Sequence, residues 1–244
     1  MNSIQYGNKR ISFEIERGVR EKTAAIHIRS QGMVFVSVPK DLDEKKIRVI
    51  VQRKAKWIIE RQDWFKNNRH SLWPKEFVSG EAFPFLGKEY RLQVVRSTSE
   101  KAAQCEIIGR RLRVEVNKNL ENEVQRRATK HAIRAWYLTR ADEKLRERVS
   151  YFSPLLGTKP RSIETKDQKK RWGSCSRDGI LRFNWKIVMA SVSVLDYVVV
   201  HELCHLIHSH HSPRFWQKIQ SVLPDYMRRR DRLRAFSVEK DLLT

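Results

Sequence analysis

Apolar and polar residues alternate between residues 11 and 39, and this is the period of half-buried β-strands. The alternation predicts three strands, at residues 11–17, 24–30 and 33–39. Gly32 is placed for a tight turn before the third strand, and Pro39 ends that strand. From residue 41 to residue 65 the apolar positions recur every three or four residues, as on one face of an amphipathic helix. The chain therefore begins with three strands followed by a helix.

Strand and helix patterns also alternate in the rest of the chain. Short strands around turn signals are expected over residues 77–116, which makes the N-terminal part a β-rich module with mixed or antiparallel pairing. A basic helix should begin near Glu121, whose charge suits a helix N-terminus, and fade near Pro154. The turn signal SRDG at 176–179 predicts a hairpin whose second strand is residues 180–189.

These patterns predict an α+β protein with two domains. We expect a β-rich module with one helix at residues 1–118 and a second domain at residues 119–244. No internal repeat at a fixed period is visible in the sequence. The boundary therefore rests only on where the strand-rich segment ends and the long helix begins.

Charge and cysteine content narrow the class of protein. Lys and Arg number 50 against 28 Asp and Glu, which gives a net charge of +22, and such a surface attracts polyanions. Nine Gly, seven Pro and 40% hydrophobic residues indicate a globular chain rather than a disordered one. Three widely spaced cysteines fit neither a disulfide framework nor a CxxC zinc site, so we expect a reducing compartment. The N-terminus lacks the apolar core of a signal peptide, and no apolar stretch could span a bilayer, so we expect a cytoplasmic protein without membrane contact.

The strongest candidate for chemistry is HELCH, which places His201, Glu202 and His205 in an HExxH pattern. With eight His in 244 residues, chance gives this pattern about 0.02 times. The run VVV precedes the motif, and Ser193 and Asp196 form a capping-box pattern upstream, so the motif should lie in a buried helix. The alternative is a buried helix whose polar side chains are satisfied internally, without a metal.

Helix geometry gives the two histidines and the glutamate different roles. His201 and His205 are about 40° apart around a helix and about 6 Å apart along it, so both imidazoles can bind one tetrahedral zinc ion. Glu202 points about 100° away from His201, which suits contact with a metal-bound water better than a bond to the metal. Zinc lowers the pKa of that water, and Glu202 would take its proton as general base during attack on a carbonyl.

A catalytic zinc ion usually has three protein ligands and a water, so a third ligand is needed. The candidates are His208, His210 and His211. His208 lies about 10.5 Å along a straight helix from His201, too far to share one ion. His211 follows His201 by ten positions, as in the longer HExxHxxGxxH pattern, and SHH before SP allows the chain to fold back. We therefore expect His211 as the third ligand, although His208 replaces the glycine of that pattern.

Three sequence blocks carry a family resemblance: KKRWGSCSRDGILRFNWKIVMA at 169–190, LDYVVVHELCHLIHSHHSPRFW at 195–216, and LPDYMRRRDRLR at 223–234. Together they resemble the YgjP-like metallopeptidases, which are related to the SprT-like zinc proteases, and FVSGEAFPFLGKEYRLQV resembles the N-terminal region of that family. The resemblance implies a zincin-like C-terminal domain with an active-site helix and an adjacent β-hairpin. It also implies zinc ligands at His201, His205 and His211 and a catalytic base at Glu202. Relatives often carry Asn at position 210, so His210 stays an alternative.

Other residues near the motif are candidates for the walls of the site. The strand ILRFNWKIV is the candidate edge strand for pairing with an extended substrate, with an ordinary core strand as the alternative. Tyr226 is a candidate oxyanion donor. Cys204 lies about 60° from the histidine face and is expected to be a packed thiol. The sequence does not separate wall residues from packing residues among Arg171, Trp172 and Asn184.

The leading hypothesis is a zinc metalloprotease that acts on proteins or peptides and binds DNA or RNA nonspecifically. Arg126, Arg127, Lys130 and Arg134 are the suggested nucleic-acid footprint, because their spacing places them on one side of a helix. One alternative is a noncatalytic nucleic-acid-binding protein stabilised by zinc, although a structural zinc ion usually has four protein ligands. Another is a metal-dependent hydrolase of phosphodiesters, although no Asp cluster accompanies HELCH. The oligomeric state is left open.

Overall fold

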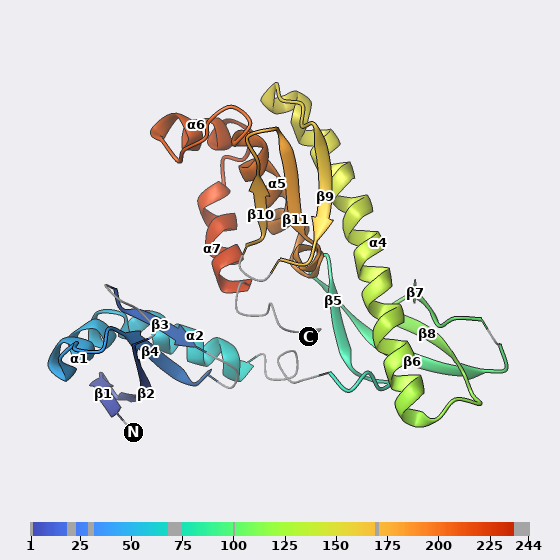
Figure 1. Cartoon of the computed structure of the whole chain (residues 1–244), viewed down its shortest axis with the longest axis horizontal. Coiled ribbons are helices and arrows are strands. Elements are labelled where there is room, and N and C mark those ends of the chain that lie inside the picture. Colours follow the sequence, from blue (N-terminus) through green and yellow to red (C-terminus); the bar gives the residue numbers. More distant parts are fainter. Residues whose placement is uncertain are drawn as a thin grey trace. The chain divides into compact units, whose positions relative to one another are not determined.

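The computed structural model describes residues 2–18, 23–28, 32–67, 75–99, 101–168 and 171–236. The chain forms two compact units, Met1–Pro74 and Lys75–Leu243 (Figure 1). Both contain strands and helices, so the predicted α+β class is confirmed.

The first unit is a four-stranded sheet covered by a helix pair. Its elements are β1 (Asn2–Tyr6), β2 (Lys9–Arg17), β3 (Ala25–Ile28), β4 (Val34–Val38), α1 (Glu44–Arg53) and α2 (Ala55–Asn67). The strand order is β1-β2-β4-β3, with a parallel central pair and antiparallel outer pairs. The three predicted strands are confirmed, whereas β1 was missed. The single predicted helix is instead interrupted at Lys54.

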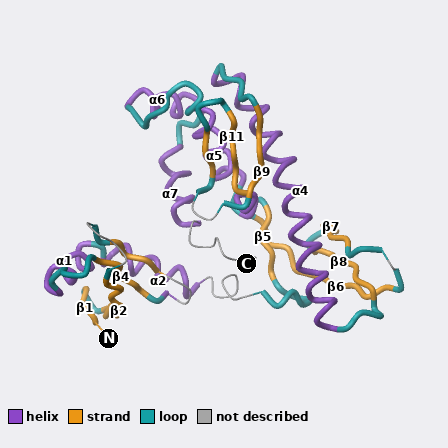
Figure 2. The backbone as a smooth tube through the Cα atoms, in the orientation of Figure 1, coloured by secondary structure: helices purple, strands orange, loops and turns teal. Residues whose placement is uncertain are grey.

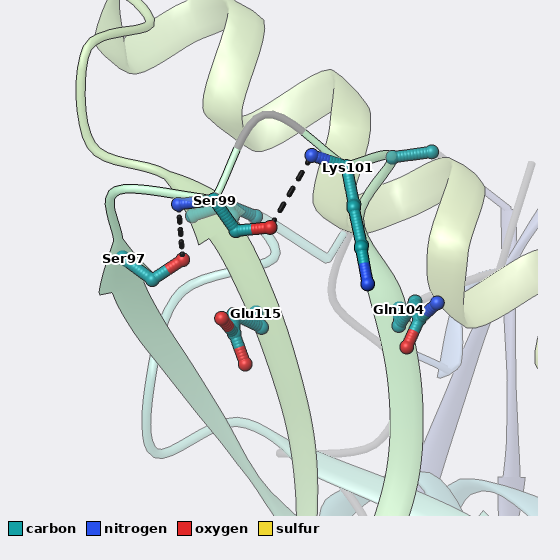
Figure 3. Close-up of a pocket in the computed structure, with 7 residues that line it drawn as sticks. Ser97, Ser99, Lys101, Gln104 and Glu115 are labelled. Carbon is teal, nitrogen blue, oxygen red and sulfur yellow. Dashed lines mark hydrogen bonds between the residues drawn. The ribbon is translucent and has the colours of Figure 1, made fainter.

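The second unit begins with another four-stranded sheet. Its strands are β5 (Ala82–Phe85), β6 (Lys88–Ser97), β7 (Gln104–Ile108) and β8 (Arg111–Asn117), in the order β5-β6-β8-β7. After β6, the hydroxyl of Ser97 accepts a hydrogen bond from the amide of Ser99, and the hydroxyl of Ser99 accepts one from the amide of Lys101 (Figure 3). These bonds hold the chain at the rim of a small pocket lined by the ends of β6, β7 and β8. Helix α4 (Asn122–Leu156) follows the sheet and packs on β7 and β8.

The two sheets are copies of one topology, each followed by a helix. In both, the central pair is parallel and the outer pairs are antiparallel, and their registers correspond. Phe13 pairs with Val34 in the first sheet, and Leu92 pairs with Leu112 in the second, at offsets of 79 and 78 residues. The structure therefore has an internal repeat, although the sequence shows none at a fixed period. The repeat lies in strand register and burial and was not visible as a residue motif.

Helix α4 leads into the part of the chain that carries HELCH. Three strands follow it, β9 (Ser162–Lys166), β10 (Gly173–Cys175) and β11 (Ile180–Asn184), which form a sheet in the order β10-β11-β9. The predicted hairpin of β10 and β11 is confirmed. Its second strand ends at Asn184, however, because the Asn184 side chain accepts a hydrogen bond from the Lys186 amide and caps the 3₁₀-helix η2 (Trp185–Met189).

The last three helices complete the second unit. They are α5 (Val192–Cys204), α6 (Pro213–Val222) and α7 (Tyr226–Phe236) (Figure 2). Helix α5 packs on α4, and its residues from Val194 to Val200 are all buried. The predicted capping box is wrong, because the N-cap of α5 is Ser191. Asp196 instead forms a buried ion pair with Arg148 of α4.

The two units divide between Pro74 and Lys75, whereas the sequence placed the boundary near residue 118. The physical reason is the second sheet, because Leu92, Leu112 and Val114 share one core cluster with residues of α4 and α5. The sheet of β5 to β8 therefore belongs with the helices that follow it. Among the described residues, no helix combines the length and the apolar character needed to cross a bilayer.

Candidate metal centre

The end of helix α5 brings His201 and His205 onto the same side. Val198–Val200 are buried and anchor the helix in the core, so the following turn reaches the surface at a fixed position. His205 is the C-cap and keeps right-handed helical dihedrals, with φ −67° and ψ −17°. The prediction that the two histidines share a helical face therefore holds, although the helix ends at Cys204.

The chain then reverses and returns a third imidazole to the first two. Ser212 caps helix α6, and its hydroxyl accepts a hydrogen bond from the amide of Phe215. This turn places Nε2 of His211 3.1 Å from Nε2 of His201. One ring nitrogen from each of His201, His205 and His211 lies within 4.8 Å of the others. Nitrogens bound at 2.0–2.1 Å to a tetrahedral zinc ion would be about 3.3 Å apart, so the cluster needs only small adjustments to hold one ion.

Hydrogen bonding orients one of these rings. Nδ1 of His205 lies 3.1 Å from the carbonyl oxygen of His208, which fixes a proton on Nδ1 and leaves Nε2 free to bind a metal. His208 thus contacts the cluster through its main chain, and its imidazole is outside the group of three. His210 is exposed and also outside that group. Nδ1 of His201 is buried and has no partner among the described residues.

Burial keeps the imidazoles in the neutral form that binds metals. Desolvation, together with the smaller effects of the neighbouring His205 and His211, lowers the pKa of His201 to about 3. Desolvation also lowers the pKa of His205. Near neutral pH these two rings are therefore unprotonated, which a zinc ligand must be.

Two aromatic side chains of α6 support the cluster and were not predicted from the sequence. The ring of Phe215 is fully buried, and its centroid lies 4.7–5.0 Å from those of His201, His205 and His211. Trp216 stacks on His211 at 5.5 Å. The only sequence signal for Phe215 and Trp216 was their place one turn after the predicted chain reversal. This signal does not identify a site, because an aromatic residue at the start of a helix has many other uses.

Glu202 lies beside the cluster and is 6% exposed. Its carboxylate fits against Gly173 of β10, where an added β-carbon would lie 2.7 Å from Oε1. Burial raises the pKa of Glu202 to about 8, and the positive charge of Arg171 partly opposes this shift. Arg171 is therefore coupled electrostatically to the site. Gly173 is a third residue that sequence reasoning missed.

Other predicted site residues have structural roles. Asn184 is fully buried and its amide donates to the main-chain oxygens of Gln168 and Arg171. Trp172 packs on Phe236, with ring centroids 5.1 Å apart. Cys204 is a buried thiol, as expected, and its pKa is raised to about 12 by burial.

Two further predictions concern the walls of the site, and the candidate role of Tyr226 as an oxyanion donor stays a prediction. Tyr226 stacks on Trp216 at 5.6 Å, so its ring meets the aromatic layer next to His211. The strand β11 is not an edge strand, because it pairs with β10 on one side and β9 on the other. That part of the prediction is wrong. The short strand β10 is at the edge of the sheet and packs against α5.

The predicted nucleic-acid footprint on α4 is largely occupied by contacts within the same unit. Arg126 forms an ion pair with Glu123 at 3.8 Å, and Arg134 forms one with Asp167 at 2.9 Å. The ammonium group of Lys130 lies 5.8 Å from the centroid of the Phe77 ring. Three of the four suggested side chains therefore already have partners.

Residues 22–236 match the family model described as YgjP-like, metallopeptidase domain. The class of protein is thus a metallopeptidase, in agreement with a cluster of three histidines beside a buried glutamate. The chain belongs to the YgjP-like family, and the resemblance seen in the sequence is confirmed.

The comparison with solved structures gave a more distant similarity. The crystal structure of the metallopeptidase zymogen of Pyrococcus abyssi abylysin has 21% sequence identity and a TM-score of 0.34, and the match covers 36% of this chain and 90% of that one. No curated protein matches the sequence.

Proposed function

We propose that this protein is a zinc-dependent protease of the HExxH type, with His201, His205 and His211 as zinc ligands and Glu202 as general base. The observation that carries the proposal is the convergence of three ring nitrogens within 4.8 Å beside a buried carboxylate. Three neutral imidazoles suit zinc and leave a fourth position for water or substrate. The donor set therefore fits a catalytic zinc ion better than a structural one.

The chemistry divides between the ion and the chain. A bound zinc ion would lower the pKa of a water molecule and polarise the peptide carbonyl. Glu202 takes a proton from the attacking water while the new C–O bond forms, and delivers it to the leaving amine nitrogen as the C–N bond breaks.

The edge of β10 supports a site for an extended polypeptide. This strand pairs only with β11 in its sheet, packs against α5, and carries Gly173 beside Glu202. An extended segment that adds to this edge would run past the general base, with main-chain hydrogen bonds providing affinity. Unfolded or loosely folded protein segments are the substrates that this arrangement favours.

The noncatalytic alternative makes a different prediction about Glu202. A zinc ion that only stabilises the fold needs no base, and Glu202 would then be a buried acid that costs stability. The arrangement of the base next to an open edge strand favours the protease.

The test combines metal content with cleavage of an unfolded protein substrate. The purified protein should contain about one zinc ion per chain and cleave the substrate. Glu202→Gln should keep the zinc and the fold but lose at least 10² to 10⁴-fold in cleavage rate, because it removes the general base. Glu143→Gln, on the exposed surface of α4, is the matched control and should cleave normally. Cleavage by Glu202→Gln at the normal rate would rule out this mechanism, and a zinc-loaded wild type without cleavage would favour the noncatalytic alternative.

A further inference from the structure

The repeated sheet-and-helix module allows the same helix face to be compared at two places in the chain. The N-cap residues Asp43 and Glu121 are 78 residues apart and have nearly the same dihedrals, with φ −62° and −58° and ψ 141° and 151°. Each accepts a hydrogen bond from the amide four residues later, at Ile47 and at Gln125. Helices α1 and α4 therefore begin with the same backbone geometry after their sheets.

The buried sides of the two helices also correspond. At the 78-residue offset the buried residues fall on equivalent positions: Ile47, Val51, Ala55 and Ile58 in α1 and α2, and Gln125, Thr129, Ile133 and Trp136 in α4. The interruption at Lys54 does not change which side is buried, because the spacing of three or four residues continues across it. The opposite side of α1 and α2 is therefore a continuous surface.

This opposite side, which we name the outer face, is strongly basic. Six exposed basic residues lie between Lys45 and Glu60. At 100° per residue four of them fall on the outer face, Lys45, Lys46, Arg53 and Lys56, and the other two are Arg48 and Lys54. None of them forms an ion pair with a carboxylate in the described part of the chain. Glu60 is the one acidic residue in this stretch. Like charges at this density repel one another, and a polyanion would relieve the repulsion.

An exposed aromatic residue lies among these basic side chains. Trp57 of α2 is 42% exposed, and Val49 of α1 is 51% exposed. At 100° per residue, Lys46, Arg53 and Trp57 fall within about 40° of one another around the helix. A flat ring in line with two cations is suited to a base stacked on the ring, with phosphates bound by the cations that precede it along the helix.

The copy in α4 lacks both features. The position equivalent to Lys45 is Glu123, which pairs with Arg126, and the position equivalent to Trp57 is Ala135. Arg134, equivalent to Lys56, pairs with Asp167. The module at α4 therefore folds without a basic surface that carries an exposed aromatic ring. Folding of the module does not require the charges and the ring on the outer face of α1 and α2.

We propose that the outer face of α1 and α2 binds single-stranded nucleic acid through phosphate contacts and through stacking of a base on Trp57. This replaces the α4 footprint as the site of nucleic-acid contact and gives the N-terminal copy of the module a function of its own. With about five phosphate contacts, the affinity for a single strand should fall about 100-fold between 50 and 200 mM salt.

The test uses the full-length chain and a fluorescein-labelled, mixed-sequence 20-nucleotide DNA strand. Fluorescence anisotropy is measured with the strand, with its duplex, and with a polyglutamate peptide as competitor. The triple variant Lys46→Glu, Arg53→Glu and Lys56→Glu should lose at least tenfold in affinity and show a flatter salt dependence. The matched control carries the same charge change on the second unit, as Arg110→Glu, Arg111→Glu and Lys118→Glu, and should change affinity much less. Thermal unfolding of both variants checks that they are folded.

Substitutions of Trp57 distinguish the binding of nucleic acid from the binding of other polyanions. Trp57→Ala should weaken single-strand binding about tenfold and duplex binding less than twofold, and Trp57→Phe should restore most of the loss. Equal losses in the two triple variants would show that only net charge matters and would overturn the proposal. Polyglutamate that competes as well as DNA, together with no effect of Trp57→Ala, would indicate an acidic protein partner and would also overturn it. No peptide cleavage is measured, so either outcome leaves the protease proposal unchanged.

Discussion

A β-carbon added to Gly173 would lie 2.7 Å from both Cγ and Oε1 of Glu202, closer than side chains can approach. The other eight of the nine glycines have positive φ, so their backbone conformations explain why they are glycine. Gly173 does not, and alanine would fit its backbone. The absence of a side chain at position 173 is therefore explained by the space that Glu202 occupies.

Gly173→Ala should reduce peptide cleavage strongly while keeping the metal. The new methyl group must push the Glu202 carboxylate aside, and a displacement of about 1 Å at a reacting group costs about 10²-fold in rate. The same overpacking should lower the free energy of unfolding by about 1–3 kcal/mol. Steady-state kinetics, zinc content and urea unfolding measure the three quantities.

A double mutant tests whether the contact with Glu202 is the cause. In a Glu202→Ala background, Gly173→Ala should have almost no effect on stability, because the atoms it would meet are gone. Ser174→Ala, at the next position of β10, is the control for general effects on the strand. If Gly173→Ala destabilises both backgrounds equally, the contact does not explain the glycine.

The residues of the histidine cluster and its surroundings were predictable from sequence to different degrees. His201 and His205 follow from helix geometry, and His211 follows from its spacing and the SP break, because these depend on local chain geometry. Gly173 and Phe215 could not be found in this way, because their contacts with the site join elements that are separate in the sequence. The edge-strand error has the same origin, since the order β10-β11-β9 depends on where β9 docks.

Two of the candidates for the third ligand, His208 and His211, should respond differently to substitution. His211→Ala should lose zinc under mild chelation, because its Nε2 lies 3.1 Å from that of His201. His208→Ala should keep zinc, because His208 contacts His205 through its carbonyl oxygen, which alanine retains. Metal analysis after dialysis against a weak chelator is the measurement. Loss of zinc from His208→Ala with retention in His211→Ala would reverse the ligand assignment.

The raised pKa of Glu202 predicts a pH-dependent cost in the metal-free protein. The folded-state pKa is about 8, above the usual value of 4.5, so folding favours the protonated form. Stability is therefore lost as the pH rises from about 4.5 towards 8, as the folded protein retains a proton that the unfolded chain releases. Glu202→Gln removes this titration and should be more stable than the wild type by about 3 kcal/mol at pH 7, with little difference near pH 4.

Urea unfolding of both metal-free proteins across this pH range measures the difference. His201 is present in both proteins, so its own lowered pKa cancels in the comparison. A stability difference that does not change between pH 4 and pH 8 would contradict the assignment of a raised pKa to Glu202.

The internal repeat shows why register can be conserved when residues are not. Between the two modules Lys40 and Leu42 recur as Lys118 and Leu120, but most strand positions differ. A sheet requires only that apolar side chains alternate on its buried face, so Phe13 and Leu92 can occupy the same position. Periodicity detects each strand separately, whereas the correspondence appears only when strand pairing is known.

The ion pair that replaces the predicted capping box should stabilise the core around α5. Asp196 accepts hydrogen bonds from Nε of Arg148 at 2.6 Å and from its Nη2 at 3.2 Å, and Arg229 lies 3.7 Å away. The Asp196 side chain is 10% exposed, and those of the two arginines are below 20%. Asp196→Ala leaves both guanidinium groups partly buried without this partner, and should lower the free energy of unfolding by about 3 kcal/mol. Asp225→Ala removes another carboxylate that binds Arg229, but from a site with 49% exposure, and should cost less than about 1 kcal/mol. Urea unfolding measures both variants, and hydrogen exchange of the α5 amides should rise only in Asp196→Ala. Equal losses in the two variants would mean that the Asp196 carboxylate stabilises α5 no more than a surface ion pair does.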